Sequence, residues 1–262
     1  MTESLPVVAT FWIGPSLRWF ERIGLSSFCA IGHRVKLYCY DPIENVPEGV
    51  ELCDAREIWE PGPAHKDLHL AAQADIFRLY LTSSTDEIWI DGDMLAIRPL
   101  TRDAAGYAVG WEVADHQVNN AVLGVPRNSD ALALLKDFVA KPFVPPWLNA
   151  HLRNTIAEVP EAERLAAICA AKRSAIGPLA LTWALRETKE DQQVQDEAAY
   201  YPIPWHLSDL FFAPQNPVDR YFTKDTAAVH LWSHLVRAYH RHRQPDPSSF
   251  LGLKCTEFGI TV

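Results

Sequence analysis

The chain alternates short apolar runs with amphipathic stretches, which predicts strands and helices in turn. An apolar, β-branched run over Val7–Ile13 predicts a buried strand. Apolar residues at helical spacing over Leu17–Ala30 predict a helix, with Ser16 as its cap and Gly32 just beyond its end. Val35–Tyr40 predicts a second strand. A strand, a helix and a strand joined by short connections are the beginning of an α/β fold with a parallel sheet.

The alternation continues to about residue 140. A helix is predicted over His65–Thr82, which is rich in Ala and Leu and contains neither Gly nor Pro. A short apolar strand over Glu87–Ile90 leads directly into an acidic turn. The other elements predicted for this part are strands at Val50–Leu52, Tyr107–Trp111 and Ala121–Val125, and a helix at Ser129–Val139 capped by Ser129.

Beyond the proline-rich bend at Lys141–Pro146 the pattern becomes mostly helical. No flexible linker precedes it, so we expect residues 1–262 to form one domain, with an α/β core in 1–140 and a helical half in 141–262. The elements predicted for this half are helices at Trp147–Ile156, Glu161–Arg173 and Pro178–Glu187, a final strand at Ala227–Leu231 and a basic segment at Arg237–Arg243.

Composition narrows the class of protein. Apolar residues make up 48% and charged residues 22% of 262 residues, which is typical of a globular domain. A formal net charge of −9 argues against nucleic acid as a partner. Five cysteines without a Cys-x-x-Cys pair argue against a disulfide framework and a structural zinc site. The longest apolar run, Leu165–Ala171, is far shorter than the ~20 residues of a membrane span, and the amino end does not resemble a secretory signal. We therefore expect no integral membrane segment and a cytoplasmic location, or one at the inner face of a membrane if the substrate is lipid-linked.

Asp91 and Asp93 are the first candidates for chemistry. They follow a hydrophobic strand and flank Gly92, and in an extended chain residues i and i+2 point to the same side. Two close carboxylates repel each other unless a cation lies between them, and Mg²⁺ and Mn²⁺ prefer oxygen ligands. The carboxyl end of a strand is also where open α/β sheets bind ligands. The alternative is a solvated turn, because Asp-Gly is a common turn dipeptide.

Asp75 and Arg78 are the second candidates. They lie three residues apart on the predicted His65–Thr82 helix and so share a face. That helix is apolar nearly all round, and a charged pair on a buried helix is costly unless something compensates. Either the two side chains satisfy each other, or Arg78 meets a phosphate or sugar oxygen while Asp75 accepts from a hydroxyl.

Trp12 and His230 are weaker candidates. Trp12 ends the first predicted strand and suits stacking on a flat base, although burial in the core is the simpler interpretation. His230 lies in an apolar strand and is either a core residue or the imidazole that completes a metal site begun by carboxylates, with His234 as a weaker candidate. The sequence contains no Gly-x-Gly-x-x-Gly, Walker or Gly-x-Ser-x-Gly motif.

Several short segments occur in a recognisable order from one end of the chain to the other. They are Phe11–Gly14, Leu25–Phe28, Gly32-His33, Leu37–Asp41, Ala74–Arg78, Ile90–Asp93, Asn119–Ala121, Gly177-Pro178 with Thr182, Tyr201-Pro202 and His230–Trp232. Together they resemble the DXD-type retaining glycosyltransferases, a group that includes alpha-1,4-galactosyltransferases, mannosyltransferases and the glucosylating domains of clostridial toxins. The family usually has Gly-Gly-x-Tyr before the DXD, where this chain has Thr85–Trp89.

The resemblance implies a GT-A fold, which is a Rossmann-like nucleotide-diphospho-sugar transferase fold, with a mostly helical C-terminal half on the acceptor side. It implies transfer of a hexose from a UDP-linked sugar to a glycan or other hydroxyl acceptor, with retention of configuration and with Mn²⁺ or Mg²⁺ as cofactor. The catalytic residues would be Asp91, Asp93 and Arg78. The implied binding roles are base stacking by Trp12, donor binding by Asp75, Arg78 and Asp91, substrate contacts by Asn119, Asn120, Gly177 and Pro178, and metal ligation by Asp91, Asp93 and His230.

Two other classes of function stay open. Ile88–Leu95 also looks like the first motif of haloacid-dehalogenase-type phosphatases, with Asp91 as nucleophile and Asp93 as general acid, although Met94 stands where that motif has Thr or Val. The chain could also be a module that binds a nucleotide sugar without turning it over.

Overall fold

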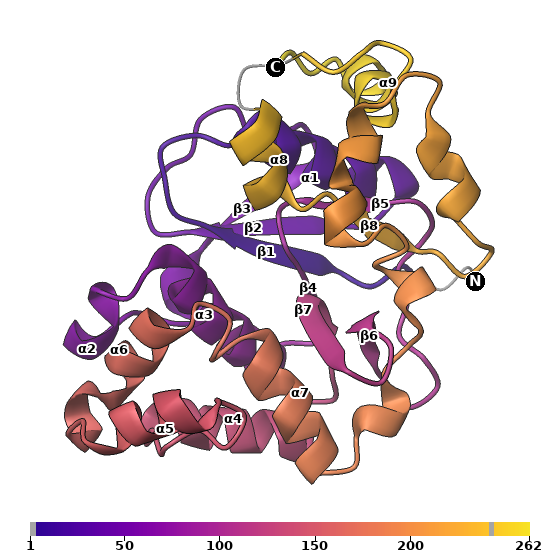
Figure 1. Ribbon diagram of the computed structural model, residues 1–262. Coiled ribbons are helices and arrows are strands. Elements are labelled where there is room, and N and C mark those ends of the chain that lie inside the picture. Colours follow the sequence, from indigo (N-terminus) through magenta and orange to yellow (C-terminus); the bar gives the residue numbers. More distant parts are fainter. Residues whose placement is uncertain (1–3, 241–243) are drawn as a thin grey trace. The chain divides into compact units, whose positions relative to one another are not determined.

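The computed structural model describes residues 4–240 and 244–262 (Figure 1). The chain divides into two compact units, each built from segments that lie far apart in the sequence. Unit 1 comprises Met1–Cys53, Ile90–Thr101 and Gln195–Val262, and unit 2 comprises Asp54–Trp89 and Arg102–Val194. The single domain with a core in 1–140 and a helical half in 141–262 stays a prediction.

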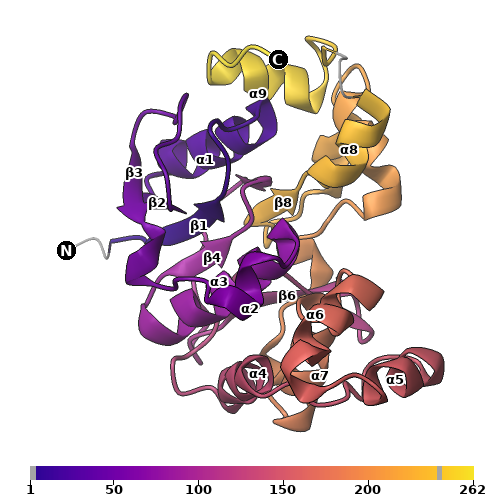
Figure 2. The same cartoon turned by 90° about the vertical axis from the view of Figure 1, so that its left-hand side faces the viewer.

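Unit 1 contains three adjacent strands in the order β3-β2-β1, visible side by side in Figure 2. β1 and β2 run parallel, with a register from Val8↔Val35 to Trp12↔Cys39. β-branched and aromatic residues fill four of the five positions of β1 and two of the five of β2, and such residues suit a pleated, buried sheet. The predicted strand, helix and strand are therefore confirmed as β1 (Val8–Trp12), α1 (Trp19–Ile31) and β2 (Val35–Cys39), followed by β3 (Val50–Asp54).

Helix α1 starts later than the sequence predicted. Arg18, not Ser16, is its N-cap, and the Glu21 side chain accepts the Arg18 backbone N–H at 3.1 Å, which is one half of a capping box. Ser16 instead forms an isolated bridge with Glu44, so the predicted cap was wrong. Gly32 ends the helix with φ +103°, a left-handed conformation that glycine adopts without steric cost.

The last quarter of the chain completes unit 1. A short strand that the sequence did not predict, β5 (Met94–Ala96), pairs antiparallel with β8 (Ala228–His230). The segments around this pair are 3₁₀ or α-helical: η3 (Glu197–Ala199), η4 (Trp205–Phe212), η5 (Pro217–Tyr221), α8 (Ser233–His240) and α9 (Phe250–Glu257).

Unit 2 has its own three strands, in the order β4-β7-β6. β6 (Ala108–Val113) and β7 (Gln117–Gly124) form an antiparallel hairpin, and β4 (Ile88–Ile90) leads back toward the next segment of unit 1. Helices α3 and α7 both pack against β7, and α4 packs against both of these helices. The helices of this unit are η1 (Ala55–Glu57), α2 (Pro63–Lys66), α3 (Leu70–Ser84), α4 (Asp130–Ala140), α5 (Ala150–Ala157), α6 (Glu161–Ala171), α7 (Pro178–Glu187) and η2 (Asp191–Gln193).

The single helix predicted over His65–Thr82 is two helices. α2 ends at Lys66, and α3 begins at Leu70 after His69, whose Nδ1 accepts the Ala72 N–H at 3.0 Å. A side chain that satisfies a free N–H of the first turn favours a new helix start at that point. The Ser129 cap of α4 and the start of α7 at Pro178 are confirmed.

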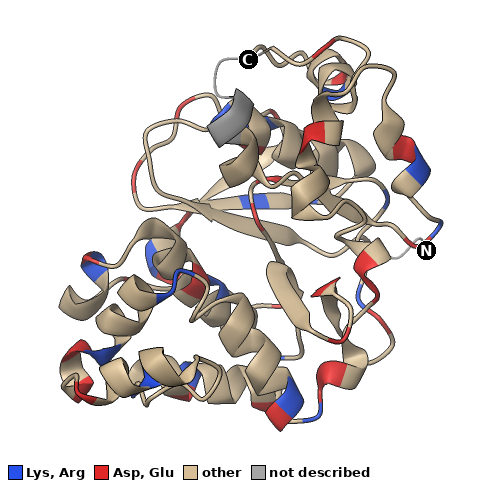
Figure 3. Cartoon of the chain, in the orientation of Figure 1, with Lys and Arg blue, Asp and Glu red and all other residues tan. Residues whose placement is uncertain are grey.

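Both units mix strands and helices, so the α/β class is confirmed. Acidic and basic residues are interspersed on the helices of unit 2 (Figure 3). Among the described residues, no helix has the combined length and apolarity needed to cross a membrane.

Candidate functional site

The pairing of β5 with β8 brings His230 beside Asp93. Asp91, Gly92 and Asp93 form a turn closed by the Met94 N–H, which donates to the Asp91 carbonyl at 2.9 Å. Met94 is then opposite His230 in the antiparallel register. A turn therefore brings Asp91 and Asp93 together. Their i, i+2 spacing had predicted that the pleat of an extended strand would do so.

Asp93 is held by the segment that follows β8. Its Oδ1 lies 3.3 Å from His230 Nε2, and its Oδ2 accepts the Ser233 N–H at 2.8 Å. The Leu231 N–H donates to the Asp93 carbonyl at 3.0 Å. Burial alone would raise the pKa of Asp93, but the charge and hydrogen bond of His230, with the Ser233 N–H, outweigh it and hold the pKa below its usual value. The carboxylate is therefore ionised and kept in one orientation.

Asp91, Asp93 and His230 form a cluster that could hold a metal ion. Each offers one ligand atom, and these atoms all lie within 4.8 Å of one another. Ligands at ~2.1 Å from one ion lie at most about 4 Å apart, so only a small closure is needed. Two carboxylates and one imidazole suit Mn²⁺ and Mg²⁺ better than a soft metal. The donor set therefore fits the divalent cation that the sequence predicted.

Helix α1 supports the acidic turn at a point that the sequence did not single out. A Cβ on Gly24 would lie 2.4 Å from the Gly92 carbonyl oxygen, so the helix backbone lies directly against the turn. Glu21, one helical turn earlier, is 3% exposed and pairs with Arg18 at 3.0 Å. Burial raises the pKa of Glu21, Arg18 lowers it, and the charge of Asp93 raises it further. The lone glycine within the apolar pattern of this helix is the signal that could have revealed the contact.

Trp12 lies at the end of β1, where the sequence placed it. The Arg18 guanidinium carbon lies 4.9 Å from the centroid of its ring, a cation–π geometry that covers one face of the indole. Its Nε1 is buried and has no hydrogen-bond partner within residues 4–240 and 244–262. Stacking of Trp12 on a base stays a prediction, and it would have to use the face that Arg18 leaves open.

A second polar cluster lies within unit 2. Asp75 and Arg78 form a buried ion pair at 3.3 Å, and both residues are about 5–6% exposed. Asn120 donates to Asp75 Oδ1 at 2.9 Å, and its carbonyl accepts from Arg78. The guanidinium also lies 4.6 Å from the centroid of the Trp89 ring. The free-energy cost of burying this charged pair is therefore offset partly by hydrogen bonds to Asn120 of β7 and by the ring of Trp89 in β4.

The side chains of Asn119 and Asn120 have different partners, although the two residues are adjacent in the sequence. Successive residues of β7 point to opposite faces, so Asn120 joins Asp75, whereas Asn119 donates to Glu112 at 2.8 Å. The structure brings only one of the two predicted substrate-binding asparagines into the Asp75 cluster.

Gly177 and Pro178 begin α7 beside the same carboxylate. Pro178 is the first helical residue, where a missing N–H costs nothing. A Cβ on Gly177 would lie 2.7 Å from both carboxylate oxygens of Asp75, so only glycine leaves them room. The positive end of the α7 dipole favours the Asp75 anion at this point.

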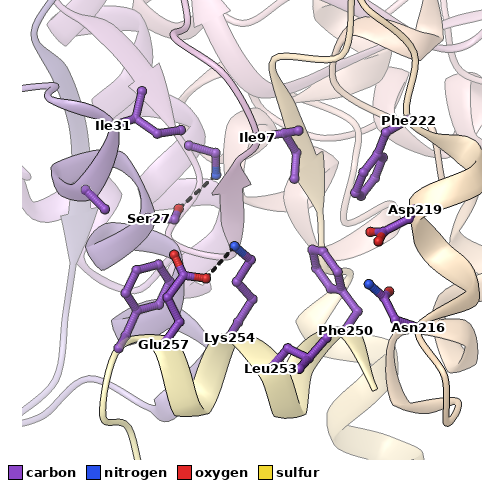
Figure 4. A pocket seen from close by; sticks show the side chains of 13 residues that line it. Ser27, Ile31, Ile97, Asn216, Asp219, Phe222, Phe250, Leu253, Lys254 and Glu257 are labelled. Carbon is purple, nitrogen blue, oxygen red and sulfur yellow. Dashed lines mark hydrogen bonds and ion pairs between the residues drawn. The ribbon is translucent and has the colours of Figure 1, made fainter. Parts of the chain in front are cut away.

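Two further features include none of these residues. The predicted basic segment Arg237–Arg243 lies outside the described part of the chain, which includes neither the side chains of residues 237–240 nor any part of residues 241–243. A cavity of about 490 Å³ lies in unit 1 and is lined by residues of α1, η5 and α9, including Ile31, Asp219 and Phe250 (Figure 4). None of the predicted site residues lines it.

No family model matches the chain, and no curated protein sequence matches it either. Among solved structures, the chain is similar to the PaToxG glycosyltransferase, with a TM-score of 0.42 and 14% identity over 70% of this chain and 68% of that one. It is also similar to the apo structure of the bifunctional glycosyltransferase WbbM, with a TM-score of 0.36 and 11% identity over 88% of this chain. The chain matches 46% of the length of WbbM.

Proposed function

We propose that this chain is a metal-dependent glycosyltransferase of the GT-A fold. It would transfer a hexose from a UDP-linked donor to a glycan or another hydroxyl acceptor, with retention of configuration. The observation that carries this proposal is the cluster of Asp91, Asp93 and His230, whose ligand atoms lie within 4.8 Å of one another at the turn after β4. The ordered sequence segments that resemble the DXD-type enzymes supply the rest of its support.

Asp91, Asp93 and His230 would hold Mn²⁺ or Mg²⁺, and the bound ion would stabilise the negative charge that develops on the departing diphosphate. Asp93 would enter this role already oriented, since its Oδ2 accepts the Ser233 N–H at 2.8 Å. A preoriented carboxylate needs little rearrangement on metal binding.

The other predicted residues would bind the donor. Arg78 has a planar guanidinium that suits a phosphate or ribose oxygen, and Asp75 can accept from a sugar hydroxyl. Trp12 would stack on the base, and Asn119, Asn120, Gly177 and Pro178 would lie near the donor or acceptor sugar. We assign no protein nucleophile, because retention by front-face attack leaves the acceptor proton to the departing phosphate.

Binding of UDP with and without Mn²⁺ tests the metal site directly. We expect Mn²⁺ to strengthen UDP binding to the wild type by at least about tenfold, and we expect Asp93→Asn to abolish this gain. Asp225→Asn is the matched control, because Asp225 is exposed in the same unit and is not part of the cluster. Equal UDP affinity with and without Mn²⁺ would contradict the proposed metal site.

Turnover separates the proposed activity from its rivals. Release of UDP from UDP-sugars in the presence of Mn²⁺, lost in Asp93→Asn and kept in Asp225→Asn, supports glycosyl transfer. Release of phosphate from an aryl phosphate would favour the phosphohydrolase instead. Binding of UDP-sugar without hydrolysis or transfer to any acceptor would identify a non-catalytic binding module.

A further inference from the structure

Trp232 has a backbone conformation that a large side chain rarely adopts. Its φ is +53°, in the left-handed region that favours glycine and asparagine. Such a conformation persists only where the surrounding structure over-determines it, and it often marks a functional site. Trp232 lies two residues after the candidate ligand His230 and directly before Ser233.

Contacts on the indole hold this residue in place. The side chain is 4% exposed, and its Nε1 donates to the Ile203 carbonyl at 2.8 Å. Its ring lies 4.0 Å from the imidazole ring of His230, centroid to centroid, with a tilt of 41°. Tyr201 approaches both rings, at 6.1 Å from His230 and 6.2 Å from Trp232. The indole therefore limits the rotation of the imidazole.

The unusual backbone also determines where the next N–H points. The Leu231 N–H donates to the Asp93 carbonyl, and the Ser233 N–H donates to Asp93 Oδ2. In an extended strand the intervening residue would direct these two N–H groups along one edge of the strand. The left-handed turn at Trp232 instead brings the second N–H onto the Asp93 side chain.

We propose that Trp232 is the positioning residue of the metal site, because this one residue orients two of the three candidate ligands, His230 through its ring and Asp93 through its backbone. Its ring fixes the plane of the His230 imidazole, and its left-handed backbone directs the Ser233 N–H that orients the Asp93 carboxylate. This inference rests on the proposed function, since it assigns these residues to a divalent cation. It adds to the proposed function that Mn²⁺ affinity depends on Trp232, a residue that does not itself bind the metal.

Three substitutions separate the ring from the backbone. Trp232→Gly removes the ring but adopts φ +53° without strain, so it relieves the backbone while losing the stack. Trp232→Phe keeps an aromatic ring, and Trp232→Leu keeps bulk without one. We expect the Mn²⁺ dissociation constant to rise about 10- to 100-fold in the Gly and Leu variants and to stay nearer the wild-type value in Phe.

Two measurements accompany the Mn²⁺ titration. Proton NMR of the metal-free protein reports the ring-current shift that the Trp232 indole causes at the His230 imidazole, which we expect Gly and Leu to remove and Phe to retain in part, while the weaker contribution of the more distant Tyr201 ring stays. Phe211→Leu is the control for general destabilisation, because Phe211 is fully buried in the same unit and packs against Phe250. We expect this control to lower the melting temperature without changing Mn²⁺ affinity.

The outcomes distinguish the two proposals. Mn²⁺ binding that is unchanged in Trp232→Gly overturns the positioning role and leaves the metal site standing. A wild-type protein that binds no Mn²⁺ overturns both. If the Gly variant does not fold, the Leu and Phe variants decide, and equal Mn²⁺ affinity in these two refutes a role for the aromatic ring.

Discussion

Helix α1 lies so close to the acidic turn that one methyl group at Gly24 should disturb both. An ideal Cβ at this position would lie 2.4 Å from the Gly92 carbonyl oxygen and 2.6 Å from that of Met94. A carbon and an oxygen in ordinary contact lie about 3.3–3.6 Å apart, so the helix and the turn would have to separate by roughly 1 Å. Both obstacles are backbone atoms, which cannot move aside as a side-chain end can.

The magnitude follows from two opposing effects of Gly24→Ala. Overpacking destabilises a protein by about 1–3 kcal/mol, and two backbone obstacles place Gly24→Ala in the upper part of this range, at about 2–3 kcal/mol. Alanine is the better helix former by about 1 kcal/mol, which offsets part of the loss. We therefore expect a net loss of about 1–2 kcal/mol and a melting temperature lower by roughly 2–8 °C.

Urea unfolding and a Mn²⁺ titration of the Gly24→Ala variant check this reasoning together. The urea midpoint should fall, and Mn²⁺ affinity should fall with it, because the turn that carries Asp91 and Asp93 is displaced. Ser26→Ala is the control, since it raises helix propensity in α1 from a half-buried position that does not face the turn. A Gly24→Ala variant as stable as the wild type would refute the close approach of α1 to the turn.

Three further predictions concern polar groups that are buried or, for Glu190, half-buried. Burial lowers the pKa of His33, whose Nε2 accepts the Leu100 N–H at 3.0 Å, so on acidification the imidazole is protonated more readily in the unfolded chain than in the folded protein. The free energy of unfolding should therefore fall as the pH drops below about 6.5, and the urea midpoint of His33→Gln should depend less on pH than that of the wild type. Gly177→Ala should lower the free energy of unfolding by about 1–3 kcal/mol, because the new methyl group displaces the Asp75 carboxylate. In a double-mutant cycle, the same substitution made in an Asp75→Ala background should lose most of this effect. Glu190 accepts hydrogen bonds from two side chains and one backbone N–H at the start of α4, so Glu190→Gln should lower the urea midpoint by the equivalent of about 1–3 kcal/mol, and an unchanged midpoint would contradict this.

Local sequence signals predicted the elements that have strong periodicity or clear end signals. The β-branched run of β1, the glycine that ends α1 and the serine that caps α4 all act over a few residues, so one sequence is enough to recognise them. The same approach missed β5, because this strand is defined by its pairing with the distant β8 and not by a local signal, and it missed the helix start at His69, because histidine is an uncommon cap.

The candidate site likewise depends partly on local sequence and partly on tertiary structure. The sequence by itself identified Asp91, Asp93 and His230 as residue types suited to one cation, because carboxylate and imidazole chemistry belongs to the side chain. Only the tertiary structure brought His230 to Asp93, through the pairing of two three-residue strands that lie more than a hundred residues apart. Likewise, nothing in the local sequence favours a left-handed tryptophan at position 232, whose conformation depends on the indole contacts with His230 and Ile203. Residue chemistry and short-range propensity are written along the chain, whereas the position of one ligand relative to another depends on packing between distant segments.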